Sequence, residues 1–280
     1  MDLLKEIDDY LMRDVLKHYF FQLYSFTTEN ISGYLPLFDL KDKSLLTVGS
    51  SGDQVINASL EGCEDITVCD VCSLSKYYYY LKVASLLSLD RDDFLRFLLR
   101  TKYSITKDYN PHLLTKKLFN MVKNNLKSLD YDSYKLWEYV FKKYNNLYFL
   151  FKDDINPERM VIHCNEYLKN DYNYNKTRKT IMNTNVSFIN EDIKEATFDR
   201  KFDNIWLSNV VQYLKYDNIM PLVDNVKEYL KHDGKILLCY YWNTVSSMKG
   251  FQVGSGLYDK IIVPGTSKNY GKNSVLVYKK

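Results

Sequence analysis

Short apolar runs alternate with turn-forming residues along two stretches of the chain. The runs have the length of buried strands, end at Gly, Asp, Asn or Ser, and cover residues 45–48, 66–69, 186–190, 202–207 and 235–241. Residues 216–231 have helical spacing, and we expect Gly234 to end that helix. Residues 256–280 have the pattern of two further strands joined by a Gly-rich loop. Together these elements predict an α/β fold with a mostly parallel, seven-stranded sheet and a terminal antiparallel pair.

Longer segments have apolar residues three and four positions apart, which is the spacing of amphipathic helices. One covers residues 2–24, another covers 74–89, and helical patterning continues through much of 91–168 with breaks at Pro111 and Pro157. Because a βα unit needs only one short helix, the excess predicts an inserted helical subdomain. We expect an N-terminal helix and lead-in at 1–43, an α/β domain at 44–90 and 171–280, and a helical insert at 91–170 that caps the acceptor.

The first strand runs into a turn that contains two glycines, and a helix is expected from about Gln54. Glycines let backbone N–H groups approach a ligand closely, and a helix N-terminus favours an anionic group. The second strand ends at Asp70, whose carboxylate can accept both hydroxyls of a ribose. We therefore expect cofactor contacts from Asp70 and from the turn residues Gly49, Ser50, Ser51, Gly52, Asp53 and Gln54.

The kind of nucleotide follows from what the turn lacks. It has no third glycine of a G-x-G-x-x-G motif, it carries Asp53 where a pyrophosphate would lie, and the chain has no P-loop motif. An acid at this place repels phosphates but tolerates the ammonium group of S-adenosylmethionine, which we expect as the cofactor. The structural alternative is a tight βα turn without a ligand.

Polar residues also follow the later strands at their carboxyl ends, where an open α/β sheet binds its ligands. We expect Asp192 to hydrogen-bond the adenine amino group, and Ser208, Asn209 and Gln212 to face the reacting end of the cofactor. The lead-in at 24–34 breaks the first helix with Thr and Asn residues. It is expected either to fold over the cofactor or to form a capped turn.

Charge and cysteine content restrict the possible partners. The chain has 38 basic and 35 acidic residues, and because they are interspersed we expect neither a nucleic-acid partner nor a polybasic membrane segment. The acidic first thirty residues lack a continuous apolar run, so we expect no signal peptide or transmembrane span and a cytoplasmic location. The five cysteines include a single C-x-x-C, Cys69 and Cys72, with no nearby histidine, which predicts buried free thiols and no metal site.

The order of elements resembles the class I methyltransferase (Rossmann-like) fold of S-adenosylmethionine-dependent transferases. Residues 24–100 are similar to a narrower family, the S-adenosylmethionine:diacylglycerol 3-amino-3-carboxypropyltransferases and their uncharacterised relatives. The resemblance is carried by Ser50–Gln54 in the turn, Asp70 at the strand end, Leu81-Lys82-Val83-Ala84, Asp93-Phe94, and Glu29 in the lead-in. Cys72-Ser73 stands where that family has Asn-Pro, so the acceptor can be a lipid or another small molecule.

Each carbon bonded to the sulfonium of S-adenosylmethionine is electrophilic, so the carbon presented to the acceptor decides the reaction. The resemblance implies transfer of the 3-amino-3-carboxypropyl group, and methyl transfer to a small molecule is the alternative. A non-catalytic cofactor-binding or structural partner is a second alternative. If the acceptor must lose a proton, the candidates for the base are Glu29, Tyr24 and Tyr213.

Overall fold

The computed structural model describes residues 23–99, 111–144, 158–210, 214, 218–240 and 274–279. The chain forms two compact units, each built from two separate stretches of sequence. The helical unit comprises Met1–Ser25 and Cys72–Asn156, and the α/β unit comprises Phe26–Val71 and Pro157–Lys280. The inserted part therefore begins directly after the second strand and ends at 156, whereas the apolar pattern placed its limits at 91 and 170.

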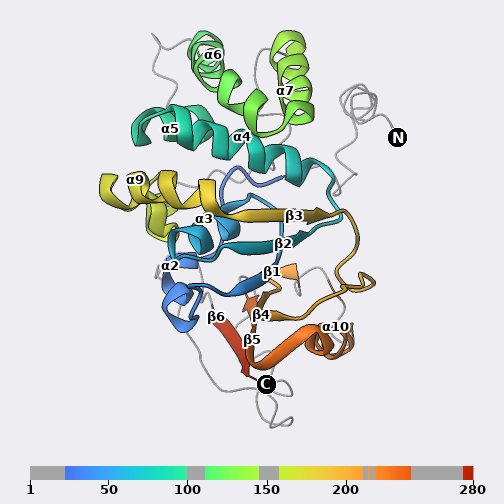
Figure 1. Ribbon diagram of the computed structural model, residues 1–280. Helices are drawn as coiled ribbons and strands as arrows, with labels where there is room; N and C mark the ends of the chain where they lie inside the picture. Colours follow the sequence, from blue (N-terminus) through green and yellow to red (C-terminus); the bar gives the residue numbers. More distant parts are fainter. Residues whose placement is uncertain are drawn as a thin grey trace. The chain divides into compact units, whose positions relative to one another are not determined.

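The α/β unit is built on one sheet with the strand order β3-β2-β1-β4-β5-β6 (Figure 1). The strands are β1 (Ser44–Val48), β2 (Asp65–Cys69), β3 (Asn185–Ile189), β4 (Phe202–Trp206), β5 (Leu230–Tyr240) and β6 (Ser274–Lys279). The first five are parallel, and β6 is antiparallel to β5. This order confirms the predicted class I methyltransferase fold. The described residues contain six of the seven predicted strands, and the remaining one falls in 256–273, outside them.

The two faces of the sheet carry different side chains because successive residues of a strand point to opposite sides. On one face Leu46, Ile205 and Ile236 belong to an apolar core with Val223 and Val226 of α10 (Ile219–Val226). On the other face, the Trp206 ring lies edge-on to the rings of Tyr34 and Phe38, at 5.4 and 5.3 Å between centroids. Tyr34 ends the short helix α2 (Ile31–Tyr34). Figure 1 shows α2 and α10 on opposite sides of the sheet.

The segment before β5 corrects one prediction. The helix expected over 216–231 ends earlier, as α10 followed by the 3-10 turn η7 (Lys227–Tyr229), and Gly234 lies inside β5 instead of ending the helix. Asp233 has a φ of 63°, and a Cβ on Gly234 would lie 2.7 Å from Leu230 Cγ and 2.9 Å from the Asp203 carbonyl oxygen. Glycine is therefore needed at this position because Leu230 and the Asp203 carbonyl lie too close to leave room for a Cβ atom. The register between β4 and β5 shifts at the same place.

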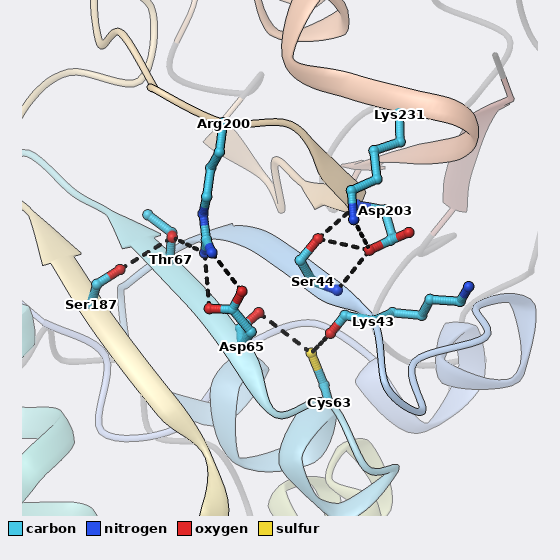
Figure 2. A network of polar contacts seen from close by, with 9 residues as sticks. All are labelled: Lys43, Ser44, Cys63, Asp65, Thr67, Ser187, Arg200, Asp203 and Lys231. Atoms are coloured by element: carbon cyan, nitrogen blue, oxygen red, sulfur yellow. Dashed lines mark hydrogen bonds and ion pairs between the residues drawn. The ribbon is translucent and has the colours of Figure 1, made fainter.

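Polar contacts tie the strands together near their amino ends (Figure 2). Arg200 donates to both oxygens of Asp65 on β2, at 2.5 and 3.0 Å, and to the Thr67 hydroxyl. One oxygen of Asp203 on β4, Oδ2, accepts from the Ser44 amide (2.9 Å), the Ser44 hydroxyl (2.7 Å) and Lys231 Nζ (2.8 Å). Burial alone would raise the pKa of Asp203, but the hydrogen bonds from Lys231 and Ser44 outweigh it and hold the pKa at about 2.

Four helices of the helical unit are described, namely α4 (Leu74–Ser88), α5 (Arg91–Leu98), α6 (Pro111–Leu129) and α7 (Tyr131–Tyr144). They confirm the helices predicted from the spacing, and Pro111 begins α6. Asp90 and Asp130 cap α5 and α7, each accepting at 2.8 Å from the amide three residues on. The rings of Phe119 and Phe141 stack at 4.0 Å between α6 and α7. The helix predicted over 2–24 lies outside the described residues except for its last two, which are not helical.

The α/β unit also holds α3 (Asp53–Leu60) after β1, and α8 (Glu158–Cys164), the 3-10 turn η3 (Glu166–Leu168) and α9 (Asp171–Thr180) before β3. α3 contacts η3 and α9. All five cysteines are free and buried, as predicted. Within the described residues, none of the helices combines the length and the apolar character needed to cross a bilayer.

Candidate functional site

The turn after β1 has the backbone geometry that the glycines predicted. Gly52 has a φ of 76° and immediately precedes α3, while Ser50 has a φ of 44° without being glycine. The Gly52 amide donates to the Gly49 carbonyl at 2.9 Å, which closes the turn. A non-glycine residue in the left-handed region is uncommon and costs free energy, and such strain gathers at ligand sites.

Asp70 meets this turn from the end of β2. Its Oδ2 accepts from the Ser50 amide at 2.6 Å, so the carboxylate and the strained turn are in direct contact. The Asp70 amide donates to the Ile189 carbonyl at 3.0 Å, and Asn190 Nδ2 donates to the Asp70 carbonyl at 2.8 Å. Three strand ends, those of β1, β2 and β3, therefore hold the half-buried Asp70 in place. The reading of the sequence did not single out Asn190, although it is a polar residue at a strand end.

Asp53 is fully buried, and its carboxylate accepts hydrogen bonds from the turn itself and from two other segments of the α/β unit. Its Oδ2 accepts from the Thr27 amide (2.6 Å) and the Ser51 hydroxyl (2.9 Å), and its Oδ1 accepts from the Tyr167 hydroxyl (2.8 Å). We predicted an acid beside the ammonium group of a cofactor, and the structure directs both carboxylate oxygens to donors of the protein. Its negative charge still lies in the first turn of α3, where the helix dipole favours it.

A second set of buried amides lies next to Asp53. Asn57 Nδ2 donates to the Asp53 carbonyl at 2.8 Å and to Asn165 Oδ1 at 2.9 Å. Asn57 Oδ1 accepts from the Glu166 amide at 2.8 Å. These bonds fix η3, which carries Tyr167, to the first turns of α3. Sequence reasoning missed Asn57, Asn165 and Tyr167, because no local pattern indicates that residues more than one hundred positions apart bond to each other.

Glu29 lies at the other side of the site, next to the loop after β4. It is buried, and its Oε1 accepts from the Ser208 hydroxyl and from the Asn209 amide (3.0 Å). Its Oε2 accepts from the Tyr34 hydroxyl at 3.3 Å, and the Cys239 thiol on β5 donates to the same carboxylate. The lead-in therefore folds back to the carboxyl ends of β4 and β5. It also contains a capped turn, because the Thr27 hydroxyl accepts from the Glu29 amide at 3.1 Å.

The groups around Glu29 have perturbed acidities. Burial raises the pKa of Glu29, and the hydrogen bonds from Ser208, Cys239, Asn209 and Tyr34 offset only part of that rise. Burial and then the Glu29 charge raise the pKa of Tyr34 well above its ordinary value, and the same two causes act on Cys239. Clusters of buried titratable groups with perturbed pKa values are common at functional sites.

Gln54 connects the two sides of the site. Its Nε2 donates to the Ser208 hydroxyl at 3.3 Å, so the first turn of α3 is joined to the loop after β4. Its Oε1 is buried and has no hydrogen-bond partner. Ser208 itself has a φ of 54°. The order of the strands reverses between β1 and β4, and α/β sheets bind ligands at such a reversal. A buried acceptor without a donor is costly, so Gln54 Oε1 suits an N–H or O–H group of a ligand.

The remaining candidates do not all join this arrangement. Asp192 follows β3 and accepts from the Lys194 amide (3.0 Å) and from Lys194 Nζ (2.9 Å), so it caps its own loop. Tyr24 belongs to the helical unit, whereas Glu29 belongs to the α/β unit. Gln212 and Tyr213 lie outside the described residues. No group of three or more metal-ligating side chains occurs within the described part of the chain.

No protein-family model and no curated protein matches the chain. Several solved structures follow a similar chain course. One is the N-methyltransferase NodS from Bradyrhizobium japonicum WM9 in complex with S-adenosyl-L-homocysteine. Its sequence is 10% identical and the TM-score is 0.41, and the alignment covers 89% of this chain and 83% of the NodS chain. A TehB-like SAM-dependent methyltransferase from Corynebacterium glutamicum is 9% identical with a TM-score of 0.41, over 99% and 96% of the two chains. An rRNA methylase from Streptococcus thermophilus is 7% identical, also with a TM-score of 0.41, over 89% and 94%.

Proposed function

We propose that this chain is an S-adenosylmethionine-dependent transferase. The observation that carries the proposal is the contact between Asp70 at the end of β2 and the strained turn after β1, with Ser50 N and Asp70 Oδ2 2.6 Å apart. This contact sets a carboxylate beside backbone N–H groups near the point where the strand order reverses. That combination suits a nucleoside whose ribose hydroxyls need an acceptor and whose tail carries a carboxylate.

Each residue of the site then has a chemical task. Asp70 would accept the ribose hydroxyls, and the N-terminus of α3, which follows the turn, would favour the carboxylate of the amino-acid tail. Gln54 Oε1 would accept from the ammonium group of that tail. Ser208 and Asn209 would lie towards the reacting end, held by Glu29. Because both Glu29 oxygens already accept hydrogen bonds, we assign Glu29 the task of positioning the loop after β4.

The transfer needs little covalent chemistry from the protein. The acceptor attacks a carbon bonded to the sulfonium, a new bond to that carbon forms, and the carbon–sulfur bond breaks with its electron pair going to sulfur. Holding the two reactants in line can supply several kcal/mol of rate acceleration. The resemblance in residues 24–100 favours transfer of the 3-amino-3-carboxypropyl group, with a lipid or other small molecule as acceptor. Methyl transfer needs the same in-line arrangement of acceptor, carbon and sulfur, so it is the alternative.

Calorimetric titration with S-adenosylmethionine tests the cofactor, and mass spectrometry of the recovered nucleoside tests the reaction. After incubation with cell extract, 5′-methylthioadenosine would identify aminocarboxypropyl transfer, and S-adenosylhomocysteine would identify methyl transfer. Binding without either product would assign the chain to non-catalytic cofactor binding.

Asp70→Asn tests the placement of the cofactor. The variant keeps the shape of the side chain but loses a charged acceptor, which is worth about 1.5–3 kcal/mol, so the cofactor affinity should fall about 10- to 150-fold. Asp199→Asn is the matched control, since Asp199 is an exposed acid of the same unit. Equal affinities of the two variants would remove Asp70 from the site.

A further inference from the structure

The helix α6 carries a charge pattern that the composition of the whole chain conceals. Its sequence contains four lysines and neither Asp nor Glu, although the chain as a whole is nearly balanced. Its apolar residues, which include Leu118, Phe119, Val122 and Leu126, are buried within the helical unit. The lysines are therefore confined to the remaining surface of the helix.

Three of these lysines and two asparagines form one row, which we call the α6 stripe and define as Lys116, Asn120, Lys123, Asn124 and Lys127. Positions separated by 4, 7, 8 and 11 residues lie within a narrow sector of an α-helix. All five are exposed except Lys123, which is half-buried. At about 1.5 Å per residue the stripe is about 16 Å long.

The stripe has no acidic partners within the described part of the chain. Lys116 and Lys123 make no hydrogen bond or ion pair there, and Lys127 lies over the rings of Tyr131 and Tyr134, at 6.0 and 5.6 Å from their centroids. The acids of the neighbouring α7 are engaged elsewhere. Asp132 pairs with Lys135 at 2.8 Å, and Glu138 accepts from the Tyr134 hydroxyl. The positive charge of the stripe is therefore not neutralised by the helix beside it.

An aromatic side chain stands at the end of the stripe. Tyr131 begins α7 and is 56% exposed, although large apolar side chains are usually covered. Lys127 and Lys135 lie 6.0 and 5.1 Å from its ring centroid. An exposed ring among lysines matches the way in which proteins hold single-stranded nucleic acids, with lysines along the phosphates and bases stacked on aromatic rings.

We propose that the α6 stripe and Tyr131 form a binding surface for single-stranded nucleic acid. A stacked strand rises about 3.4 Å per nucleotide, so a stripe of about 16 Å matches the rise of about five nucleotides, and its three lysines can each contact a phosphate. The asparagines add neutral donors for phosphate and sugar oxygens. A membrane surface fits less well, because helices that lie in a bilayer present several large apolar residues, and Met121 alone does so among the described side chains of α6. The proposal does not depend on the cofactor site.

Fluorescence anisotropy with a labelled 15-nucleotide single-stranded RNA tests the lysines. With three phosphate contacts, the logarithm of the binding constant should fall with the logarithm of the salt concentration with a slope of about −2. The affinity of the wild type for the RNA should therefore fall about 20-fold between 50 and 200 mM salt. The triple variant in which Lys116, Lys123 and Lys127 are changed to Gln should lose most of this salt dependence. It should also bind RNA at least tenfold more weakly than the wild type at 50 mM salt. The matched control changes Lys41, Lys176 and Lys179 to Gln, which alters the net charge equally at exposed positions of the other unit.

Tyr131→Ala tests the stacking, with Tyr131→Phe as the variant that keeps the ring. Loss of one stacked base should weaken RNA binding about tenfold for Tyr131→Ala, leave Tyr131→Phe unchanged, and leave binding of an abasic strand of equal length unchanged. Circular dichroism and thermal unfolding confirm that each variant is folded. Equal binding by the α6 and control triple variants would overturn the proposal. So would an equal loss on RNA and abasic strands, or binding to phosphatidylserine vesicles without binding to RNA.

Discussion

Replacing Asp203 by Asn should destabilise the α/β unit by an amount that depends on pH. Three donors, two of them from Ser44 and one from Lys231, converge on a single oxygen of Asp203 (Figure 2). The carbonyl oxygen of an asparagine can take the place of that oxygen, so the substitution keeps the acceptor and removes the negative charge. The difference in unfolding free energy between the two proteins therefore reports the charge.

The magnitude follows from the pKa of Asp203, which is about 2 in the folded protein against an ordinary value of 3.8. At about 1.4 kcal/mol per pKa unit this difference corresponds to about 2.5 kcal/mol, and because solvent partly screens the pair with Lys231 we expect about 1–2 kcal/mol. A lowered pKa means that the stabilisation is complete well above the ordinary pKa and is lost as the pH falls towards 2. About half of it should remain at pH 3.

Urea unfolding at pH 7, 5, 4 and 3 measures this difference for the wild type, Asp203→Asn and the exposed control Asp199→Asn. We expect Asp203→Asn to be less stable than the wild type by about 1–2 kcal/mol at pH 7 and 5, and by about half as much at pH 3. The control should follow the wild type throughout. A difference that is equal at pH 7 and pH 3, or that grows in acid, would refute the assignment of charge stabilisation to Asp203.

Two further substitutions test the candidate site. Tyr167→Phe removes the hydroxyl that donates to the buried Asp53 carboxylate, so it should lower the unfolding free energy in urea titrations by about 1.5–3 kcal/mol. It should also weaken cofactor binding in calorimetry. An unchanged affinity with lowered stability would mean that the hydroxyl does not support the turn. Glu29→Gln should change the pH dependence of stability. Because the pKa of Glu29 is raised, its ionisation costs stability as the pH rises above 4.5. The variant should therefore gain stability relative to the wild type as the pH rises from 4.5, whereas parallel curves would contradict a raised pKa.

The sequence was sufficient for those parts of the fold that depend on neighbouring residues. Apolar runs predicted β1 and β2, the glycines predicted the turn between β1 and α3, and the spacing predicted the helices of the helical unit. Gly234 was misinterpreted because a glycine that ends a helix and one that permits close packing within a strand look alike in sequence. The division of the chain after residue 71 depends on which helices pack together, which periodicity does not reveal.

The candidate site was predictable only where a residue follows its own strand. Asp70, Ser208 and Asn209 were candidates from the sequence because polar residues after parallel strands gather at one edge of the sheet. Contacts such as that between Glu29 and Asn209 join residues 180 positions apart, and no periodic pattern encodes such a pairing. The α6 stripe was missed for a related reason, because counting charges along a chain does not show which of them share one side of a helix.

The bonds to Asp53 also have a consequence for the order of events while the chain is being synthesised. Thr27 and Asp53 are 26 residues apart, but Tyr167 lies 114 residues beyond Asp53. A ribosome that has made β1, the turn and β2 has therefore not yet supplied the third partner of the buried carboxylate, and it must first complete the whole helical unit. The turn after β1 can reach its final hydrogen bonding only after that delay, so the proposed nucleoside site would form late in synthesis, once residues from both ends of the α/β unit are in contact.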